Sequence, residues 1–99
     1  MGDIAELIHR RRRQVLVHSV LYYKFGDSII SDATFDSWAR ELARLQNENP
    51  AISDSVEYML EPFRGFVGET GYDLPLHDKN AQRVAKHLGY GPQPDKITV

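Results

Sequence analysis

The fold is decided where two helical patterns meet, in residues 22–36, which read YYKFGDSIISDATFD. Up to the start of this stretch and into it, apolar residues recur every three or four positions over residues 16–25, as in an amphipathic helix. Gly26 is suited to end that helix, because glycine adopts the left-handed backbone that often follows a helix C-terminus. Either Ser31 or Asp32 is suited to cap the helix that follows.

The apolar pattern of the whole chain predicts an all-α fold, a small helical domain of about four helices. We expect these helices near residues 3–25, 32–48, 53–63 and 78–88. Because the first connection is short, the first two helices are expected to form an N-terminal antiparallel hairpin. The stripes facing each other across it would be Leu16, Val17, Val20 and Leu21 against Phe35, Trp38, Leu42 and Leu45.

Acidic residues mark the starts of the last two predicted helices. Asp54 with Glu57 resembles a capping box, in which two side chains satisfy the first free N–H groups of a helix. Asp78 is suited to cap the last helix.

A chain of 99 residues has room for a single domain. We divide it into residues 1–50, which form the hairpin, residues 51–90, a helical half without an assignment, and a tail of residues 91–99. The sequence has no cysteine, which excludes a disulfide scaffold, a Cys-type zinc site and a thiol nucleophile. No apolar run approaches the roughly 18 residues of a membrane-spanning helix. We therefore expect a cytoplasmic protein that does not enter a membrane.

Charge is distributed unevenly along the chain. Residues 1–24 hold five Lys or Arg and two acidic residues. Residues 25–61 hold two arginines and eight acidic residues. The basic excess includes the run Arg10, Arg11, Arg12 and Arg13. Such a run neutralises phosphates without reading bases, so it predicts contact with an anionic partner, including weak contact with nucleic acid. The alternative is a solvated arm, although four consecutive helical residues point to all sides and one must face the core. In either case we expect the run to be dispensable for folding.

Aromatic and acidic side chains gather at the junction of the two helical patterns. Tyr22 and Tyr23 end the first helix, and Asp32 and Asp36 share one face of the second. Aromatic rings beside two carboxylates suit a flat, cationic ligand with hydroxyl groups, because the ring stacks and the acids accept hydrogen bonds. The structural alternative is that Asp32 only caps the helix, and that Phe35 and one tyrosine belong only to the core.

The sequence offers no pattern typical of a catalytic or metal centre. Its histidines include no i,i+4 pair and no HExxH motif; they are His9, His18, His77 and His87. No nucleophile stands with a matching base. We therefore expect neither an enzyme nor a metal site, and no required cofactor.

The segment from His18 to Pro50 resembles the N-terminal Ia segment of NAD+-dependent bacterial DNA ligases. The family pattern has a tyrosine pair, or Tyr-His, then a short spacer, then Ile-[Ser/Pro]-Asp-x-x-[Tyr/Phe]-Asp. Here the pair is Tyr22–Tyr23 and the second motif is Ile30–Asp36, with Phe35 where the family usually has tyrosine. In that family the segment forms a helical cap over the nicotinamide mononucleotide half of NAD+. The resemblance implies that Tyr22, Tyr23, Asp32 and Asp36 contact such a ligand.

The resemblance covers about a third of the chain, and residues 51–99 do not follow the ligase. The lysine motif K-x-D-G is absent, as are the oligonucleotide-binding, zinc-finger and helix-hairpin-helix parts of a ligase. This implies a detached, stand-alone copy of the cap. Such a copy would suit a compact viral or mobile-element gene, and its product would then act in the host cytoplasm.

We therefore expect a non-catalytic module that binds NAD+, nicotinamide mononucleotide or a related nucleotide. The alternative is a protein-interaction module or an inhibitor that acts on a host replication, repair or nucleotide-signalling protein. A homo-oligomer is part of that alternative, because the basic head and the acidic middle of the chain are complementary.

Overall fold

The computed structural model describes residues 3–26, 30–68 and 74–90, and every regular element in these ranges is helical. The elements are α1 (Asp3–Phe25), α2 (Asp32–Glu48), α3 (Pro50–Ser55) and α4 (Lys79–Ala85), which continues as a π-helical turn (Lys86–Tyr90). The all-α prediction is confirmed, and the bounds predicted for the first two helices agree with α1 and α2. The division at residues 50 and 90 and the tail of residues 91–99 stay predictions, and the tail lies outside the described residues.

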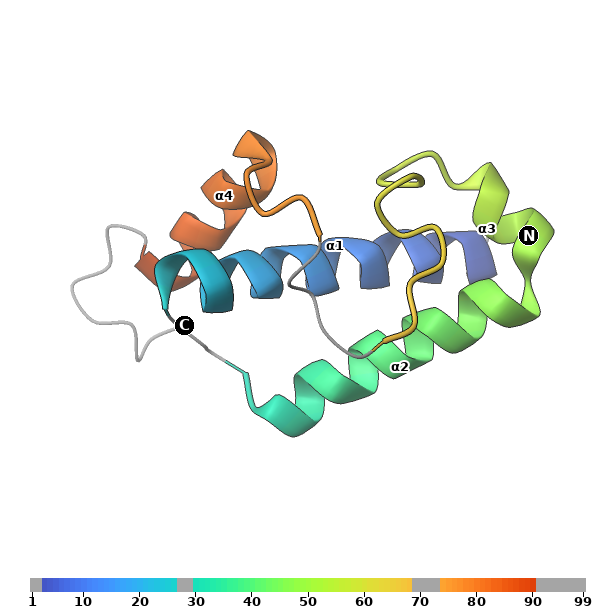
Figure 1. Ribbon diagram of the computed structural model, residues 1–99, viewed down its shortest axis with the longest axis horizontal. Coiled ribbons are helices and arrows are strands. Elements are labelled where there is room, and N and C mark those ends of the chain that lie inside the picture. The colour runs from blue at the N-terminus through green and yellow to red at the C-terminus, as the bar shows by residue number, and fades with distance from the viewer. Residues whose placement is uncertain (1–2, 27–29, 69–73, 91–99) are drawn as a thin grey trace.

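Helix α1 is the centre of the molecule. It contacts α2, α3 and α4, and α3 also contacts α2. Figure 1 shows α2 along one side of α1, while α3 and α4 lie over the other side, α3 near its start and α4 near its end. The connection between α1 and α2 includes residues 27–29, which lie outside the described ranges, so the antiparallel hairpin stays a prediction.

The core is built from the apolar stripe of α1 and from one face of each surrounding element. The stripe Leu16–Leu21 is buried, as are Leu42 and Leu45 of α2. Phe35 and Trp38 are only partly buried and pack against the edge of the core. The other buried apolar residues come from the start of α1, from α2 and from the segments around α3 and α4; they are Ile8, Val15, Ala39, Val56, Phe63, Leu74, Leu76, Ala81 and Ala85.

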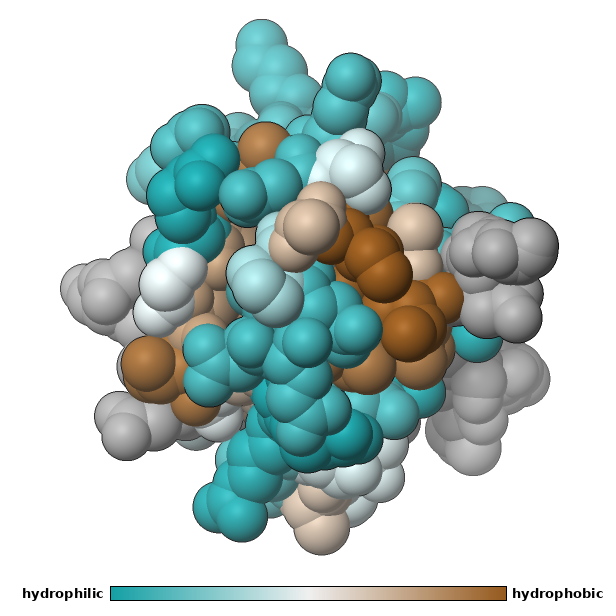
Figure 2. Space-filling view, turned by 90° about the vertical axis from the view of Figure 1, so that its right-hand side faces the viewer, coloured by the Kyte–Doolittle hydropathy of each residue, from teal (hydrophilic) through white to brown (hydrophobic). Residues whose placement is uncertain are grey.

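The core reaches the surface at the end of the molecule that holds the start of α1 and helix α3. Figure 2 looks onto this end and shows apolar side chains between hydrophilic ones. Ile4 and Ile52 are among the partly buried residues that pack against the core there.

Arg12 is the one charged residue fully buried among the described residues, with 1% of its surface exposed. Its Nε donates to Gln46 Oε1 at 2.8 Å. Nη1 donates to the carbonyl oxygens of Val56 and Tyr58, both at 2.8 Å. Nη2 donates to the carbonyl oxygen and the hydroxyl of Ser53, at 3.1 and 3.0 Å. All five guanidinium N–H donors are therefore used.

The expectation that the whole arginine run is dispensable for folding is wrong for Arg12. At helical spacing this position points between α2 and α3, where neutral oxygens surround it. Burial lowers the pKa of Arg12, and the Asp54 carboxylate acts in the opposite direction. The guanidinium nevertheless stays protonated, because an arginine side chain is not deprotonated in proteins.

The third helix differs from the prediction of residues 53–63. Helix α3 spans Pro50–Ser55, and residues 58–65 form turns. Pro50 suits the first turn of a helix, where its missing N–H costs nothing. Pro62 has no N–H to offer the carbonyl of Tyr58, and Arg12 takes that carbonyl instead. Asp54 is not the predicted cap; it lies within α3 and pairs with Arg64 at 3.5 Å.

The fourth helix begins where it was predicted and ends early. The Asp78 carboxylate accepts a hydrogen bond from the Ala81 N–H at 2.9 Å, so the predicted cap is confirmed. The α-helical pattern stops at Ala85, and a π-helical turn follows.

Gly68 lies directly on the backbone of α2. Its φ is +82°, and a Cβ placed on it would lie 2.9 Å from the carbonyl oxygen of Ala39. Figure 1 shows the chain after α3 crossing to α2 at this place. Gly65 also has a positive φ, of +78°, but nothing lies within 4 Å of its Cβ position.

We predict that Arg12→Met lowers the free energy of unfolding by at least about 3 kcal/mol, because it leaves buried carbonyl, amide and hydroxyl oxygens without a donor. Arg12→Lys should also destabilise the protein, because an ammonium cannot reach all five acceptors. Arg13→Met, one position away, is the control and should stay within about 0.5 kcal/mol. Urea denaturation followed by circular dichroism measures all three. A fully stable Arg12→Met variant would contradict the assignment.

We predict that Gly68→Ala is more destabilising than Gly65→Ala. Both variants force alanine into the left-handed region, which costs about 1–2 kcal/mol. Only Gly68→Ala adds a backbone clash, which costs about 1–3 kcal/mol more. Equal unfolding free energies for the two variants in urea would show that the loop does not press on α2.

Candidate functional site

Both tyrosines of the predicted site are exposed at the end of α1. Tyr22 is 57% exposed and Tyr23 is 39% exposed. Their rings meet edge to face, with centroids 4.9 Å apart and an interplanar angle of 84°. The alternative in which one tyrosine belongs only to the core is therefore wrong. Exposed aromatic rings of this size offer faces on which a flat ligand can stack.

The first turn of α2 is capped by Ser31. Its backbone is extended, with φ −73° and ψ 158°, and its hydroxyl accepts a hydrogen bond from the Thr34 N–H at 3.0 Å. Of the two candidate caps it is therefore Ser31 that serves, and Asp32 is already the first helical residue. Asp32 lies exposed in the first turn, where a carboxylate favours the helix dipole. Its oxygens are not taken up by the cap.

Asp36 lies one turn further along α2 and is also exposed. Its carboxylate is 3.8 Å from the guanidinium of Arg40, and both side chains are largely solvated. Such an i,i+4 pair contributes little stability and opens readily. The carboxylate is therefore accessible to a ligand.

The two pairs of candidate residues lie on either side of the connection between α1 and α2. Figure 1 places the end of α1 and the start of α2 at the same end of the molecule. The structure brings Tyr22 and Tyr23 into direct contact with each other. Asp32 and Asp36 share one face of α2 because they are four residues apart.

The C-terminal half of the chain also reaches the end of α1. Lys24 Nζ lies 3.4 Å from Nδ1 of His77, which precedes α4. The two residues are 53 positions apart, and no local pattern in the sequence relates them. Sequence reasoning therefore missed this contact.

The four arginines of residues 10–13 have different surroundings. Arg11 pairs with Glu41 of α2 at 2.6 Å and lies over the ring of Trp38 at 5.9 Å. Arg12 is buried, so the prediction that it contacts an anionic partner is wrong. Arg10 and Arg13 are exposed.

Comparison with known proteins assigns this arrangement to a family. The family described as "DNA ligase-like, N-terminal NAD+-binding domain" matches residues 1–55, more than half of the chain. The chain belongs to this family. The match covers α1, α2 and α3. The expectation that no residue after position 50 follows the ligase is therefore wrong, because the match includes residues 51–55.

The relatives are bacterial DNA ligases. The chain is 39% identical over 65 residues to a DNA ligase of Endomicrobium trichonymphae, which is 64% of this chain and 10% of that protein. It is 34% identical over 56 residues to a DNA ligase of Wolbachia pipientis, which is 57% of this chain and 9% of that protein. The chain thus spans about a tenth of the length of these relatives. No solved structure matches it.

Metal-binding clusters and membrane-spanning helices do not occur in the part of the chain that the structure describes. Within the described ranges, no three His, Asp or Glu residues gather in a way that would hold a metal ion. None of the helices described is both long and apolar enough to cross a membrane.

We predict that Ser31→Ala and Asp32→Ala differ in their effect on stability. Ser31→Ala removes the cap and should cost about 0.5–2 kcal/mol of unfolding free energy. Asp32→Ala removes only the interaction with the helix dipole and should cost at most about 0.3–1 kcal/mol. Thermal denaturation measures both, and a larger loss for Asp32→Ala would contradict the assignment of Ser31 as the cap.

Proposed function

We propose that this chain binds the nicotinamide mononucleotide half of NAD+, or free nicotinamide mononucleotide, at the junction of α1 and α2. The observation that carries the proposal is the pair of exposed tyrosines at the end of α1, which lie within the residues that the family model matches. The family is described as NAD+-binding.

Each residue has a distinct part in the proposed site. The nicotinamide ring of NAD+ is flat and positively charged, so it stacks on the face of Tyr22 or Tyr23 through cation–π attraction. Asp32 and Asp36 accept hydrogen bonds from the ribose hydroxyl groups. Lys24 supplies a positive charge for the phosphate of the ligand.

The proposed role is binding and not catalysis. The chain corresponds to about a tenth of its ligase relatives and lacks the K-x-D-G lysine motif. An exposed surface such as this one covers only one side of a ligand, so we expect a weak affinity, in the millimolar range. No further cofactor is needed for binding of this kind.

We predict that Asp36→Ala abolishes nucleotide binding and leaves stability nearly unchanged. The Asp36–Arg40 pair is exposed and contributes only about 0.3–0.5 kcal/mol. Arg40→Gln is the matched control, because it breaks the same ion pair and keeps the carboxylate. Calorimetric titration with millimolar NAD+ and with nicotinamide mononucleotide should detect a heat of binding for the wild type and for Arg40→Gln, and none for Asp36→Ala. Absence of heat for the wild type, or binding by Asp36→Ala, would refute the proposed site.

A further inference from the structure

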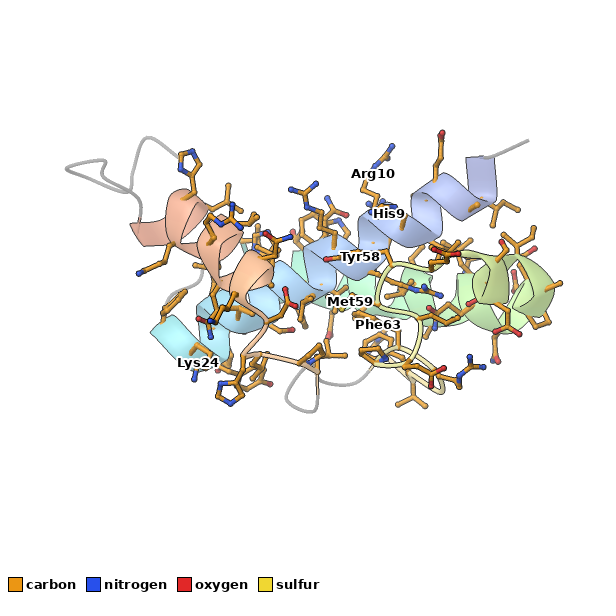
Figure 3. The ribbon with its side chains drawn as sticks, turned by 90° about the horizontal axis from the view of Figure 1, so that it is seen from above. His9, Arg10, Lys24, Tyr58, Met59 and Phe63 are labelled. Carbon is orange, nitrogen blue, oxygen red and sulfur yellow. The ribbon has the colours of Figure 1, made fainter. Side chains whose placement is uncertain are left out.

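A second surface, formed by basic and aromatic side chains, lies over the N-terminal half of α1, away from the proposed nucleotide site. It consists of His9, Arg10 and Arg13 of α1 and Tyr58 from the turn after α3, and we refer to it as the basic–aromatic surface. Figure 3 shows His9 close to Tyr58 over this part of α1, with Arg10 projecting outward from the helix beside His9. Twelve residues separate Arg10 from Tyr22, which corresponds to about 18 Å along the helix. The surface is therefore separate from the proposed nucleotide site.

The aromatic part of this surface is a stack of two parallel rings. The rings of His9 and Tyr58 have centroids 4.7 Å apart and an interplanar angle of 13°. Tyr58 is half-buried, whereas His9 is exposed. The tyrosine therefore covers one face of the imidazole ring, while the His9 side chain as a whole stays exposed.

The position of Tyr58 is fixed by the buried core. Arg12 holds its carbonyl oxygen at 2.8 Å. The next residue, Met59, has a φ of 54°, which a side-chain-bearing residue adopts only at a cost in conformational energy. Burial raises the pKa of the Tyr58 hydroxyl, and the Asp78 carboxylate acts in the same direction, whereas the Arg13 charge acts in the opposite direction. The net shift is upward, so the phenol stays neutral. The ring under His9 is thus rigidly placed and uncharged.

The charged part of the surface consists of two exposed arginines, Arg10 and Arg13. Within the described residues, neither Arg10 nor Arg13 has an ion pair, in contrast to Arg11, which pairs with Glu41. The two are three residues apart and are therefore neighbours on the helix surface. The Asp78 carboxylate, which acts on Tyr58, is engaged by the Ala81 N–H.

We propose that the basic–aromatic surface binds single-stranded nucleic acid. Arg10 and Arg13 contact successive phosphates of one strand, and an unpaired base stacks on the exposed ring of His9. Guanidinium groups beside a stacking ring are the usual means of binding single strands without sequence preference. A base inside a duplex cannot reach this ring without being unstacked, so single strands are favoured over duplexes. This inference does not depend on the proposed nucleotide site.

The test uses the full chain and fluorescence anisotropy with a labelled oligothymidine of twelve nucleotides at low salt. A duplex and a single strand of abasic residues, of equal length, separate base stacking from phosphate contact. We expect the wild type to bind oligothymidine better than either of these. Arg10→Gln/Arg13→Gln should weaken binding at least tenfold and reduce the slope of log K against log salt by about 1.4, since each phosphate on a single strand contributes about 0.7.

His9→Ala separates stacking from charge. It should weaken binding of oligothymidine on the order of tenfold, which lies within the range of about five- to 150-fold that one stacked base contributes. It should leave binding of the abasic strand unchanged. Arg44→Gln/Arg64→Gln is the matched control, since it removes the same charge from exposed ion pairs elsewhere. This control should bind as the wild type does. Thermal denaturation of every variant verifies that it is folded.

Several outcomes would overturn the inference. They are a wild type that does not bind oligothymidine, equal binding of the abasic strand or the duplex, and equal weakening by the control variant. Loss of nucleotide binding at the junction of α1 and α2 would have no bearing on it, because His9→Ala and Arg10→Gln/Arg13→Gln leave that junction intact.

Discussion

The structure depends on one buried guanidinium. Arg12 of α1 donates five hydrogen bonds, one to α2, two to α3 and two to the turn after α3. Burying a positive charge is costly, and the cost is offset only where every donor meets an acceptor. None of the five acceptors is a carboxylate; four are backbone or side-chain oxygens of Ser53, Val56 and Tyr58. The position of α3 relative to α1 is therefore specified closely.

This constraint joins the part of the chain that the family model matches to the segment after it. The family match ends at residue 55, and the carbonyl groups of Val56 and Tyr58 lie just beyond that point. By holding them, Arg12 ends α3 and directs the chain toward α2, where Gly68 makes close contact. The same turn places Tyr58 against His9. One interaction thus organises both the core and a surface feature.

The prediction from sequence was accurate where structure is decided locally. The bounds of α1 and α2 follow from apolar periodicity and from glycine and serine at the junction, and all of these signals lie within a few residues. The bounds predicted for the third helix were wrong, because the end of this helix is set by Arg12, more than 40 residues earlier in the chain. The same contact explains why Arg12 was wrongly predicted to contact an anionic partner. The sequence shows that one arginine of the run must face the core, but it does not show which one.

In the candidate site, too, local features could be predicted from the sequence, and contacts between distant segments could not. Tyr22, Tyr23, Asp32 and Asp36 could be proposed from the sequence because a motif with fixed spacing carries them. Their role in binding stays a prediction. The contact of Lys24 with His77 and the stack of His9 on Tyr58 were not found, since each joins segments far apart in the sequence. Contacts of this kind depend on how the elements pack, and a single sequence gives no direct signal for them.

The central claim is that the Arg12 guanidinium is buried and fully hydrogen-bonded, and side-chain NMR of the arginines tests it most directly. In a sample labelled with ¹⁵N, the Nε–H and Nη–H protons of Arg12 should give separate signals. These should exchange with water roughly a hundredfold or more slowly than those of Arg10 and Arg13, because they are released only when the surrounding structure opens. Exchange of the Arg12 protons as fast as those of Arg10 and Arg13 would contradict the account.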